Sequence, residues 1–183
     1  EDYSVKVDFE YNPAPNHDIK FGVNYINHAF KPGVSVAAFR FQMDTIVASM
    51  DTTIGNSDVY SNETSIYAED NIDLGHAIKA NVGLHYSTFN VQGKFYQSLQ
   101  PRFSLRVLLN DKLSVKAGYA AMNQYIHLLS NSNLSLPTDL WVPVTKRIQP
   151  MNSHQISGGA FYNLNNLIDL SVEAYYKTMN NLI

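Results

Sequence analysis

The sequence predicts an all-β fold, namely an antiparallel up-and-down segment of a transmembrane β-barrel with about eight strands. Three observations support this prediction. Apolar and polar residues alternate through most of the chain, the connections between alternating segments are short and long in turn, and tyrosines gather near the ends of the apolar faces.

The opening segment shows the alternation most clearly. Every odd position from Tyr3 to Tyr11 is aromatic or Val, and the residues between them are Ser, Lys, Asp and Glu. Such a strand has one apolar and one polar face. The same pattern predicts further strands near residues 19–25, 65–74, 78–86, 103–109, 115–119, 156–162 and 168–176. The segment 65–74 fits least well, because Asp70 falls on its apolar face.

The connections predict the topology. Short ones, rich in the Asn, Asp, Gly and Pro of tight turns, lie at residues 12–16, 75–77, 110–112 and 163–166. Longer stretches lie between them, at residues 27–62, 89–100 and 123–152. Short periplasmic turns at one end and long extracellular loops at the other are typical of an outer-membrane barrel.

The apolar faces are expected to contact lipid, with tyrosines forming a girdle at each water boundary. The polar faces would then point into a lumen. We expect these residues to face lipid: Val5, Phe21, Val82, Leu84, Leu105, Val115, Leu170 and Val172.

Composition excludes several classes of protein. A net charge of -3 with scattered Lys and Arg offers no basic stripe for nucleic acid. The absence of Cys excludes a disulfide scaffold and a thiolate metal site. No apolar run is long enough for a transmembrane helix. A mean hydropathy of -0.20 still suits barrel strands, because only every second residue is apolar.

Several phrases of the sequence carry a family resemblance. They are Ile66–Ile72 (IYAEDNI), Pro101–Arg106 (PRFSLR), Lys116–Tyr119 (KAGY), Leu136–Pro143 (LPTDLWVP) and Val172–Lys177 (VEAYYK). In this order and spacing the chain resembles the β-barrel domain of TonB-dependent receptors, in particular the Bacteroidetes-type nutrient receptors. The resemblance covers most of the chain.

The resemblance implies nutrient import across the outer membrane of a Gram-negative bacterium. It implies as partners the TonB complex, reached through a plug and TonB box, a nutrient ligand (glycan, peptide or metal chelate) and outer-membrane lipid. By analogy with the family, a surface lipoprotein is a further partner. We expect residues 1–183 to be an internal part of one barrel domain, without the plug, the TonB box or the barrel C-terminus.

One long loop is the candidate ligand-binding segment. Between Gln124 and Pro150 it contains Tyr125, His127, Asp139 and Trp141, the only Trp of the chain. Aromatic and polar groups together can stack on a ligand and hydrogen-bond to it. The alternative is that Trp141 and the leucines of the loop pack against one another.

The sequence predicts no enzyme, no catalytic residue, no metal site and no cofactor. The six His residues are scattered, and no two have the spacing of a local metal pair. Glu69 and Asp70 are adjacent in a strand, so they point to opposite faces and do not form an acid/base pair.

Two other protein classes fit part of the pattern. A soluble carbohydrate-binding β-sandwich would explain the strands and the exposed aromatics. A complete small outer-membrane barrel, such as an adhesin, would explain the strand number. The sequence does not choose among possible nutrients.

Overall fold

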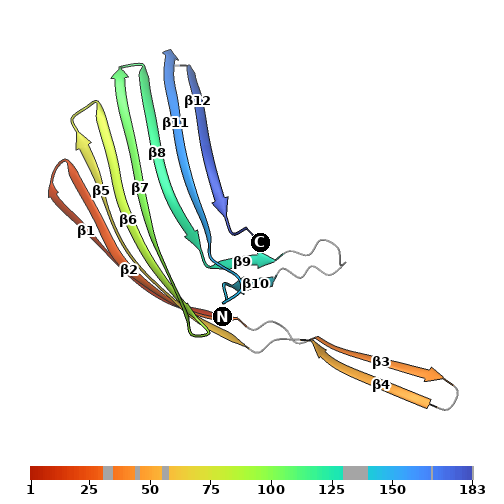
Figure 1. The fold of residues 1–183 in the computed structure, drawn as a ribbon. Helices are drawn as coiled ribbons and strands as arrows, with labels where there is room; N and C mark the ends of the chain where they lie inside the picture. The colour runs from red at the N-terminus through yellow and green to blue at the C-terminus, as the bar shows by residue number, and fades with distance from the viewer. Residues whose placement is uncertain (31–34, 44–45, 55–57, 130–139, 166, 183) are drawn as a thin grey trace.

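The computed structural model describes residues 1–30, 35–43, 46–54, 58–129, 140–165 and 167–182. It contains one eight-stranded antiparallel sheet in the order β1-β2-β5-β6-β7-β8-β11-β12 (Figure 1). The strands are β1 (Asp2–Ala14), β2 (His17–Phe30), β5 (Val59–Leu74), β6 (Ile78–Val91), β7 (Lys94–Asn110), β8 (Leu113–Gln124), β11 (Met151–Asn165) and β12 (Ile168–Asn180). This confirms the predicted fold class.

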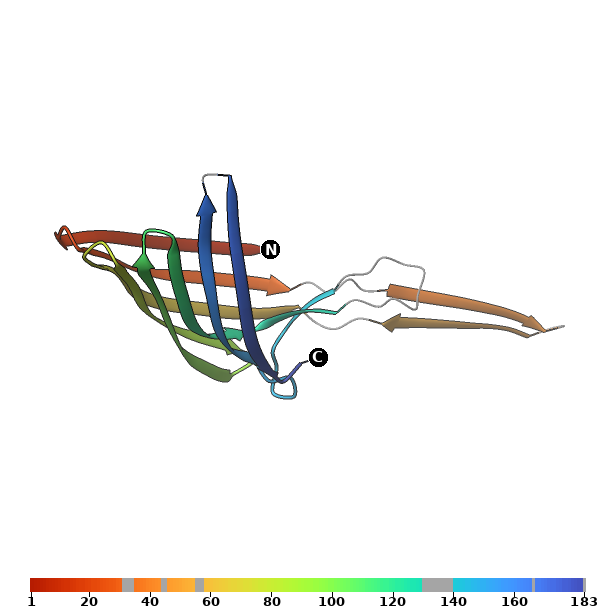
Figure 2. The same cartoon turned by 90° about the horizontal axis from the view of Figure 1, so that it is seen from above.

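The sheet is a single curved layer whose two edges do not meet. Each strand pairs with its neighbours in the order of the chain, and β1 and β12 form the edges. Figure 1 shows β1 at one edge of the sheet and β12 at the other, and Figure 2 shows the curvature from above. We call the end of the sheet with the four short turns the turn end, and the opposite end the loop end.

The register separates apolar from polar residues. One row, on the apolar face, runs through Val7, Val23, Ile66, Tyr86 and Leu99. The neighbouring row lies on the polar face and runs, in the same strand order, through Asp8, Gly22, Tyr67, His85 and Gln100. All eight residues expected to face lipid lie on the apolar face. Its large side chains are exposed, as at Val172, which is 75% accessible.

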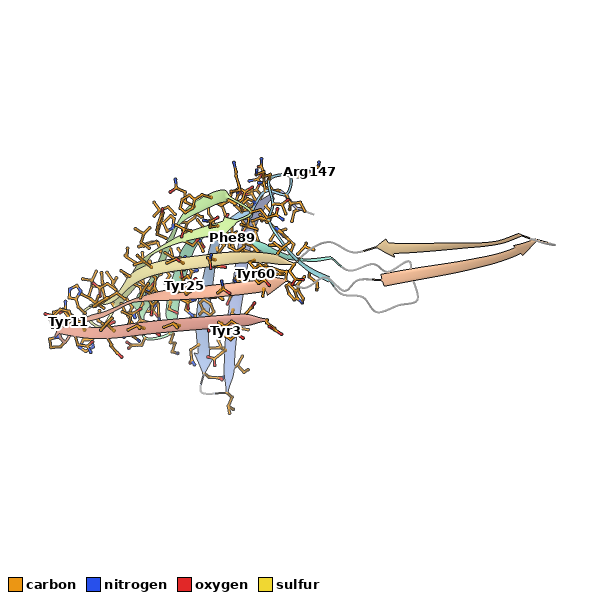
Figure 3. The ribbon with its side chains drawn as sticks, turned by 90° about the horizontal axis from the view of Figure 1, so that it is seen from below. Tyr3, Tyr11, Tyr25, Tyr60, Phe89 and Arg147 are labelled. Carbon is orange, nitrogen blue, oxygen red and sulfur yellow. The ribbon has the colours of Figure 1, made fainter. Side chains whose placement is uncertain are left out.

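Tyrosines lie toward both ends of the apolar face. Tyr3 and Tyr11 mark the two ends of β1 in Figure 3, and both are exposed. Tyr162 lies at the turn end of β11, whereas Tyr25 and Tyr86 lie toward the loop end. The arrangement is that of two aromatic girdles.

The turn end is built as the short connections predict. Asn110 Oδ1 accepts hydrogen bonds from the backbone amides of Lys112 and Leu113, both at 2.9 Å. Asp70, the polar exception on an apolar face, lies 2.7 Å from His17 Nδ1. A polar partner on the neighbouring strand therefore accounts for the weak alternation of β5.

The prediction of a long loop at residues 89–100 is wrong. Strands β6 and β7 continue through this segment and are joined by Gln92 and Gly93, with φ of 48° and 72°. Two consecutive positive φ angles are typical of a tight hairpin turn. The alternation changes phase here, because Tyr86 is on the apolar face whereas Phe89 and Val91 are on the polar face.

The other two long connections carry short strands of their own. Residues 27–62 include the ends of β2 and β5 and a hairpin of β3 (Ser35–Met43) and β4 (Ile46–Ile54), which extends away from the sheet (Figures 1 and 2). Residues 123–152 include β9 (Ile126–Leu129) and β10 (Leu140–Pro143). Among the described residues no helix is long and apolar enough to cross a membrane.

Candidate functional site

The connection between β8 and β11 folds onto the polar face of the sheet at its loop end. The ladder of β9 and β10 pairs Leu128 with Trp141, and the Val144 amide donates to the Tyr125 carbonyl at 2.8 Å. A small buried core forms between this segment and the sheet. Its members are Val59, Phe89, Val91, Tyr125 and Val144, with Phe30, Tyr96 and Ile126 packed against them.

Tyr125 joins the loop segment to the sheet. Its ring stacks on Phe89 with 4.8 Å between centroids and 8° between planes. Its hydroxyl lies 2.9 Å from Ser87 Oγ, which also accepts a hydrogen bond from Gln100 Nε2 at 2.9 Å. The side chain is 4% exposed, and burial raises the pKa of its hydroxyl. The phenol is therefore occupied by contacts within the protein.

The remaining residues of the predicted ligand-binding set lie in different surroundings. His127 is 5% exposed, and burial lowers the pKa of its ring. Trp141 is 57% exposed and shares its face of the β9–β10 ladder with Leu128. Asp139 lies outside the described residues. The structure therefore buries Tyr125 and His127 and leaves Trp141 at the surface.

Trp141 lines a pocket of about 540 Å³ at the loop end of the sheet. Phe30 and Val59 form part of its wall, and Lys146 and Arg147 supply two positive charges. The remaining lining residues are Gln92, Val142, Pro143, Thr145 and Ile148. Such a pocket combines an indole surface and apolar walls with cations, a combination suited to orienting a bound molecule.

A turn beside the pocket presents the two cations. Thr145 Oγ1 accepts hydrogen bonds from the amides of Arg147 and Ile148, both at 3.2 Å. The Tyr96 hydroxyl donates to the Thr145 carbonyl at 2.6 Å, which ties the turn to β7. Lys146 and Arg147 are exposed, and Arg147 projects at the loop end in Figure 3.

A buried histidine lies near this core, beyond the tyrosine girdle. His28 is 4% exposed, with Nδ1 3.0 Å from Asp2 Oδ1 and Nε2 3.5 Å from Glu63 Oε2. Neither ring nitrogen has a well-aligned hydrogen bond among the described residues. Contact with Glu63 raises the pKa of His28 most, burial opposes this, and Asp2 raises the pKa further. His28 also lies 6.2 Å from Phe89, ring to ring.

Lys146, Arg147 and His28 were not predicted from the sequence as members of this region. A usable signal was present for the first two, because the basic pair follows Trp141 closely in the same loop. No comparable signal identified His28, since its two carboxylate partners come from other strands. In the described parts of the chain, no group of three or more His, Cys, Asp and Glu residues is arranged to hold a metal ion.

The fold and this region define a class of protein. A single sheet with an uncovered apolar face, tyrosines toward both ends and loops folded over one end is the wall of a membrane β-barrel. The family model of the TonB dependent receptor-like β-barrel matches residues 1–183. The chain therefore belongs to the TonB-dependent receptor β-barrel family and is located in the outer membrane.

Solved structures share this fold at low sequence identity. The FrpB iron transporter from Neisseria meningitidis (F3-3 variant) aligns with a TM-score of 0.61 and 14% identity over 94% of this chain. The siderophore receptor PirA from Acinetobacter baumannii aligns with a TM-score of 0.65 and 14% identity over 97%. The chain spans 28% and 26% of these two proteins. No curated protein sequence matches it.

The two alternative classes lack support. A β-sandwich would cover the apolar face with a second sheet, but the large side chains on that face are exposed. A complete small barrel would pair its first and last strands, whereas β1 and β12 each have one neighbour.

Proposed function

We propose that this chain forms part of the barrel wall and extracellular loops of a TonB-dependent receptor that imports a nutrient across the outer membrane. Residues 1–183 then belong to one barrel domain, of the Bacteroidetes type, with the plug and TonB box elsewhere in the polypeptide. The observation that supports this proposal is the family match along the whole chain, together with a loop segment that folds over the polar face. The protein acts as a receptor and not as an enzyme.

The pocket beside Trp141 is proposed as a contact site for the nutrient. In this orientation the loop end faces the cell exterior, and an incoming molecule meets Trp141, Lys146 and Arg147 first. Tyr125 and His127 contribute by holding the loop in place. A glycan, a peptide and a metal chelate all offer groups that stack on an indole or pair with a cation.

The structures with a similar fold suggest one ligand class to include in a binding test. The two structures named above are an iron transporter and a siderophore receptor, so ferric chelates join oligosaccharides and peptides as trial ligands. A surface lipoprotein and the TonB complex are proposed partners in this uptake.

Uptake by whole cells tests the proposal. A Gram-negative host that displays the complete receptor is offered labelled ferric chelates, oligosaccharides or peptides. Accumulation of one class should require the receptor and TonB, and should stop when a proton uncoupler collapses the inner-membrane gradient. Receptor-dependent uptake that survives both the loss of TonB and the uncoupler would contradict an energised receptor and indicate a passive channel.

A further inference from the structure

Two large aromatic side chains lie exposed on the apolar face, beyond the tyrosine girdle at the loop end. Tyr60 of β5 and Phe95 of β7 are each 58% accessible. Both keep the alternation that places Ile66 and Leu99 on this face. Figure 3 shows Tyr60 farther toward the loop end than Tyr25 of the girdle. Large exposed rings outside the membrane indicate a contact surface, because water alone does not favour them there.

Two exposed asparagines lie beside these rings. Asn62 of β5 is directly opposite Asn90 of β6, and Asn90 is directly opposite Phe95. Asn62 Oδ1 accepts hydrogen bonds from the Tyr25 hydroxyl at 2.8 Å and from Asn27 Nδ2 at 2.7 Å. The Asn90 side chain has no hydrogen bond among the described residues, so its amide can bind an outside group. We call this set the outer patch: Tyr60, Asn62, Asn90 and Phe95. Strands lie about 4.8 Å apart, so the outer patch spans roughly 10 Å.

The outer patch is uncharged. From the girdle to the loop end, the apolar face of β2, β5, β6 and β7 carries only Tyr, Asn, Ala, Thr, Phe, Gln and Leu. The cation nearest in sequence, Lys94, belongs to the polar face, where its ammonium lies 5.7 Å from the centre of the Tyr96 ring. A phosphate is bound through Lys or Arg side chains, which the outer patch does not offer. Sugar hydroxyls pair with neutral amides instead, and the C–H faces of sugar rings pack on aromatic rings.

The height of the outer patch separates it from phospholipid headgroups. Asn90 follows Tyr86 of the girdle by four residues on β6, which is about 13 Å along a strand. A barrel strand tilted by about 40° rises about 10 Å over that length. The headgroup layer extends only about 5–8 Å beyond the hydrocarbon core. The outer patch therefore lies above phospholipid headgroups, at a level that a membrane lipid reaches when its headgroup carries sugars.

We propose that the outer patch binds the sugar headgroup of an outer-leaflet glycolipid. Sugar rings stack on Tyr60 and Phe95, and their hydroxyls exchange hydrogen bonds with the amides of Asn62 and Asn90. The outer patch continues the lipid-facing wall on the same strands, so a lipid whose chains pack on Leu84 carries its headgroup to this place. The inference rests on the proposed orientation, with the loop end outside the cell, and is independent of which nutrient the receptor carries.

Native mass spectrometry of the complete receptor tests the site. The receptor is purified in an amine-oxide detergent, which carries no sugar, and is mixed with diglucosyl diacylglycerol or with phosphatidylglycerol of the same acyl chains. The receptor should retain several times more of the diglucosyl lipid, because both lipids offer the same chains to the wall and only one offers sugars to the outer patch. Equal retention of the two lipids would overturn the proposal.

Substitutions locate the sugar contact. The double variant Tyr60→Ala, Phe95→Ala should lower retention of the diglucosyl lipid about fivefold or more. Its retention of phosphatidylglycerol should stay unchanged, which also shows that the wall is intact. Leu84→Ala truncates an exposed apolar residue within the lipid-facing wall and serves as the control. It should affect the two lipids equally. A double variant that keeps the preference of the wild type for the diglucosyl lipid overturns the proposal.

A phospholipid and a soluble glycan are the competing occupants. Asn90→Lys adds a cation to the outer patch, so increased retention of phosphatidylglycerol by this variant would place the patch among phosphates and overturn the proposal. Unchanged retention of phosphatidylglycerol supports it. The second arm adds the same disaccharide without its acyl chains. If it displaces the diglucosyl lipid at an equal concentration, the outer patch is a soluble-glycan site and the glycolipid is excluded. Displacement only at a far higher concentration supports the glycolipid.

Discussion

Tyr125 stacks on Phe89 with 4.8 Å between ring centroids, and its hydroxyl lies 2.9 Å from Ser87 Oγ. This contact joins the residue that follows β8 to the part of β6 that lies at the loop end of the sheet. The β9–β10 segment and the turn at Lys146 and Arg147 follow from it in sequence, so the position of the candidate pocket depends on this stack.

Removing the stacked ring should release the loop. Tyr125→Ala creates a cavity against Phe89, and such truncations cost about 3–5 kcal/mol. Tyr125→Phe keeps the stack and should cost only about 1 kcal/mol through the lost hydroxyl. Limited trypsin digestion measures the release, because Lys146 and Arg147 are cleavage sites in the anchored turn. Equal cleavage rates for Tyr125→Ala and the wild type would show that the stack does not hold the loop.

The apolar face should reject charge and the polar face should accept it. Val172 and Ser171 are neighbours on β12 that point to opposite faces, and both are exposed in the sheet. Val172→Arg places a cation against lipid and should cost about 2–4 kcal/mol near the membrane midplane. Ser171→Arg should assemble normally. The yield of heat-modifiable, folded receptor in outer membranes compares the two, and similar yields would contradict the assigned orientation.

His28 should make the loop end sensitive to pH. Its pKa is raised above 6.5 in the folded protein, chiefly by Glu63. The protonated ring therefore stabilises the folded state fully below about pH 6.5, and this contribution is lost as pH rises through the raised pKa. The melting temperature of the wild type should exceed that of His28→Gln most at acid pH. A difference that grows toward alkaline pH would be the wrong sign.

His127 supplies an internal contrast. Burial lowers its pKa, so its neutral ring contributes stability that is present above its unfolded pKa and lost as pH falls. The difference between wild type and His127→Gln should therefore shrink in acid, opposite to the trend for His28. Melting curves of both variants across about pH 5 to pH 8 separate the two residues.

The period-two pattern was sufficient to predict the eight strands, because lipid or solvent selects the same face along each strand. It failed at residues 89–100, where Phe89 and Val91 move to the polar face beneath Tyr125. Beyond the membrane the polar face becomes the buried one, so the phase of the pattern changes while the strand continues. The sequence pattern therefore predicts the end of a strand at this change of phase, although β6 and β7 continue through it.

The candidate site was only partly predictable, for a related reason. Trp141 was predicted as a ligand contact, and the structure places it on the pocket. Tyr125 and His127 were in the same predicted set, yet tertiary packing buries both. Whether a loop aromatic faces a ligand or its own sheet depends on contacts across strands.

The last prediction concerns Trp141 as a ligand contact. Its side chain is 57% exposed and lines the pocket with Lys146 and Arg147. A stacking aromatic contributes on the order of 1 kcal/mol beyond its buried area. Trp141→Ala in the complete receptor should therefore weaken ligand binding about fivefold. Binding is measured on whole cells once the uptake assay has identified a ligand, and is normalised to the amount of receptor at the surface.

Leu128→Ala is the matched control, because Leu128 pairs with Trp141 in the β9–β10 ladder, is also exposed and does not line the pocket. If Trp141 contacts the ligand, only its own substitution weakens binding, and surface display of both variants equals that of the wild type. Equal weakening by both variants would assign the effect to the shape of the loop. If Trp141→Ala lowers the amount of receptor at the surface as much as it lowers binding, Trp141 is a packing residue that is needed for assembly.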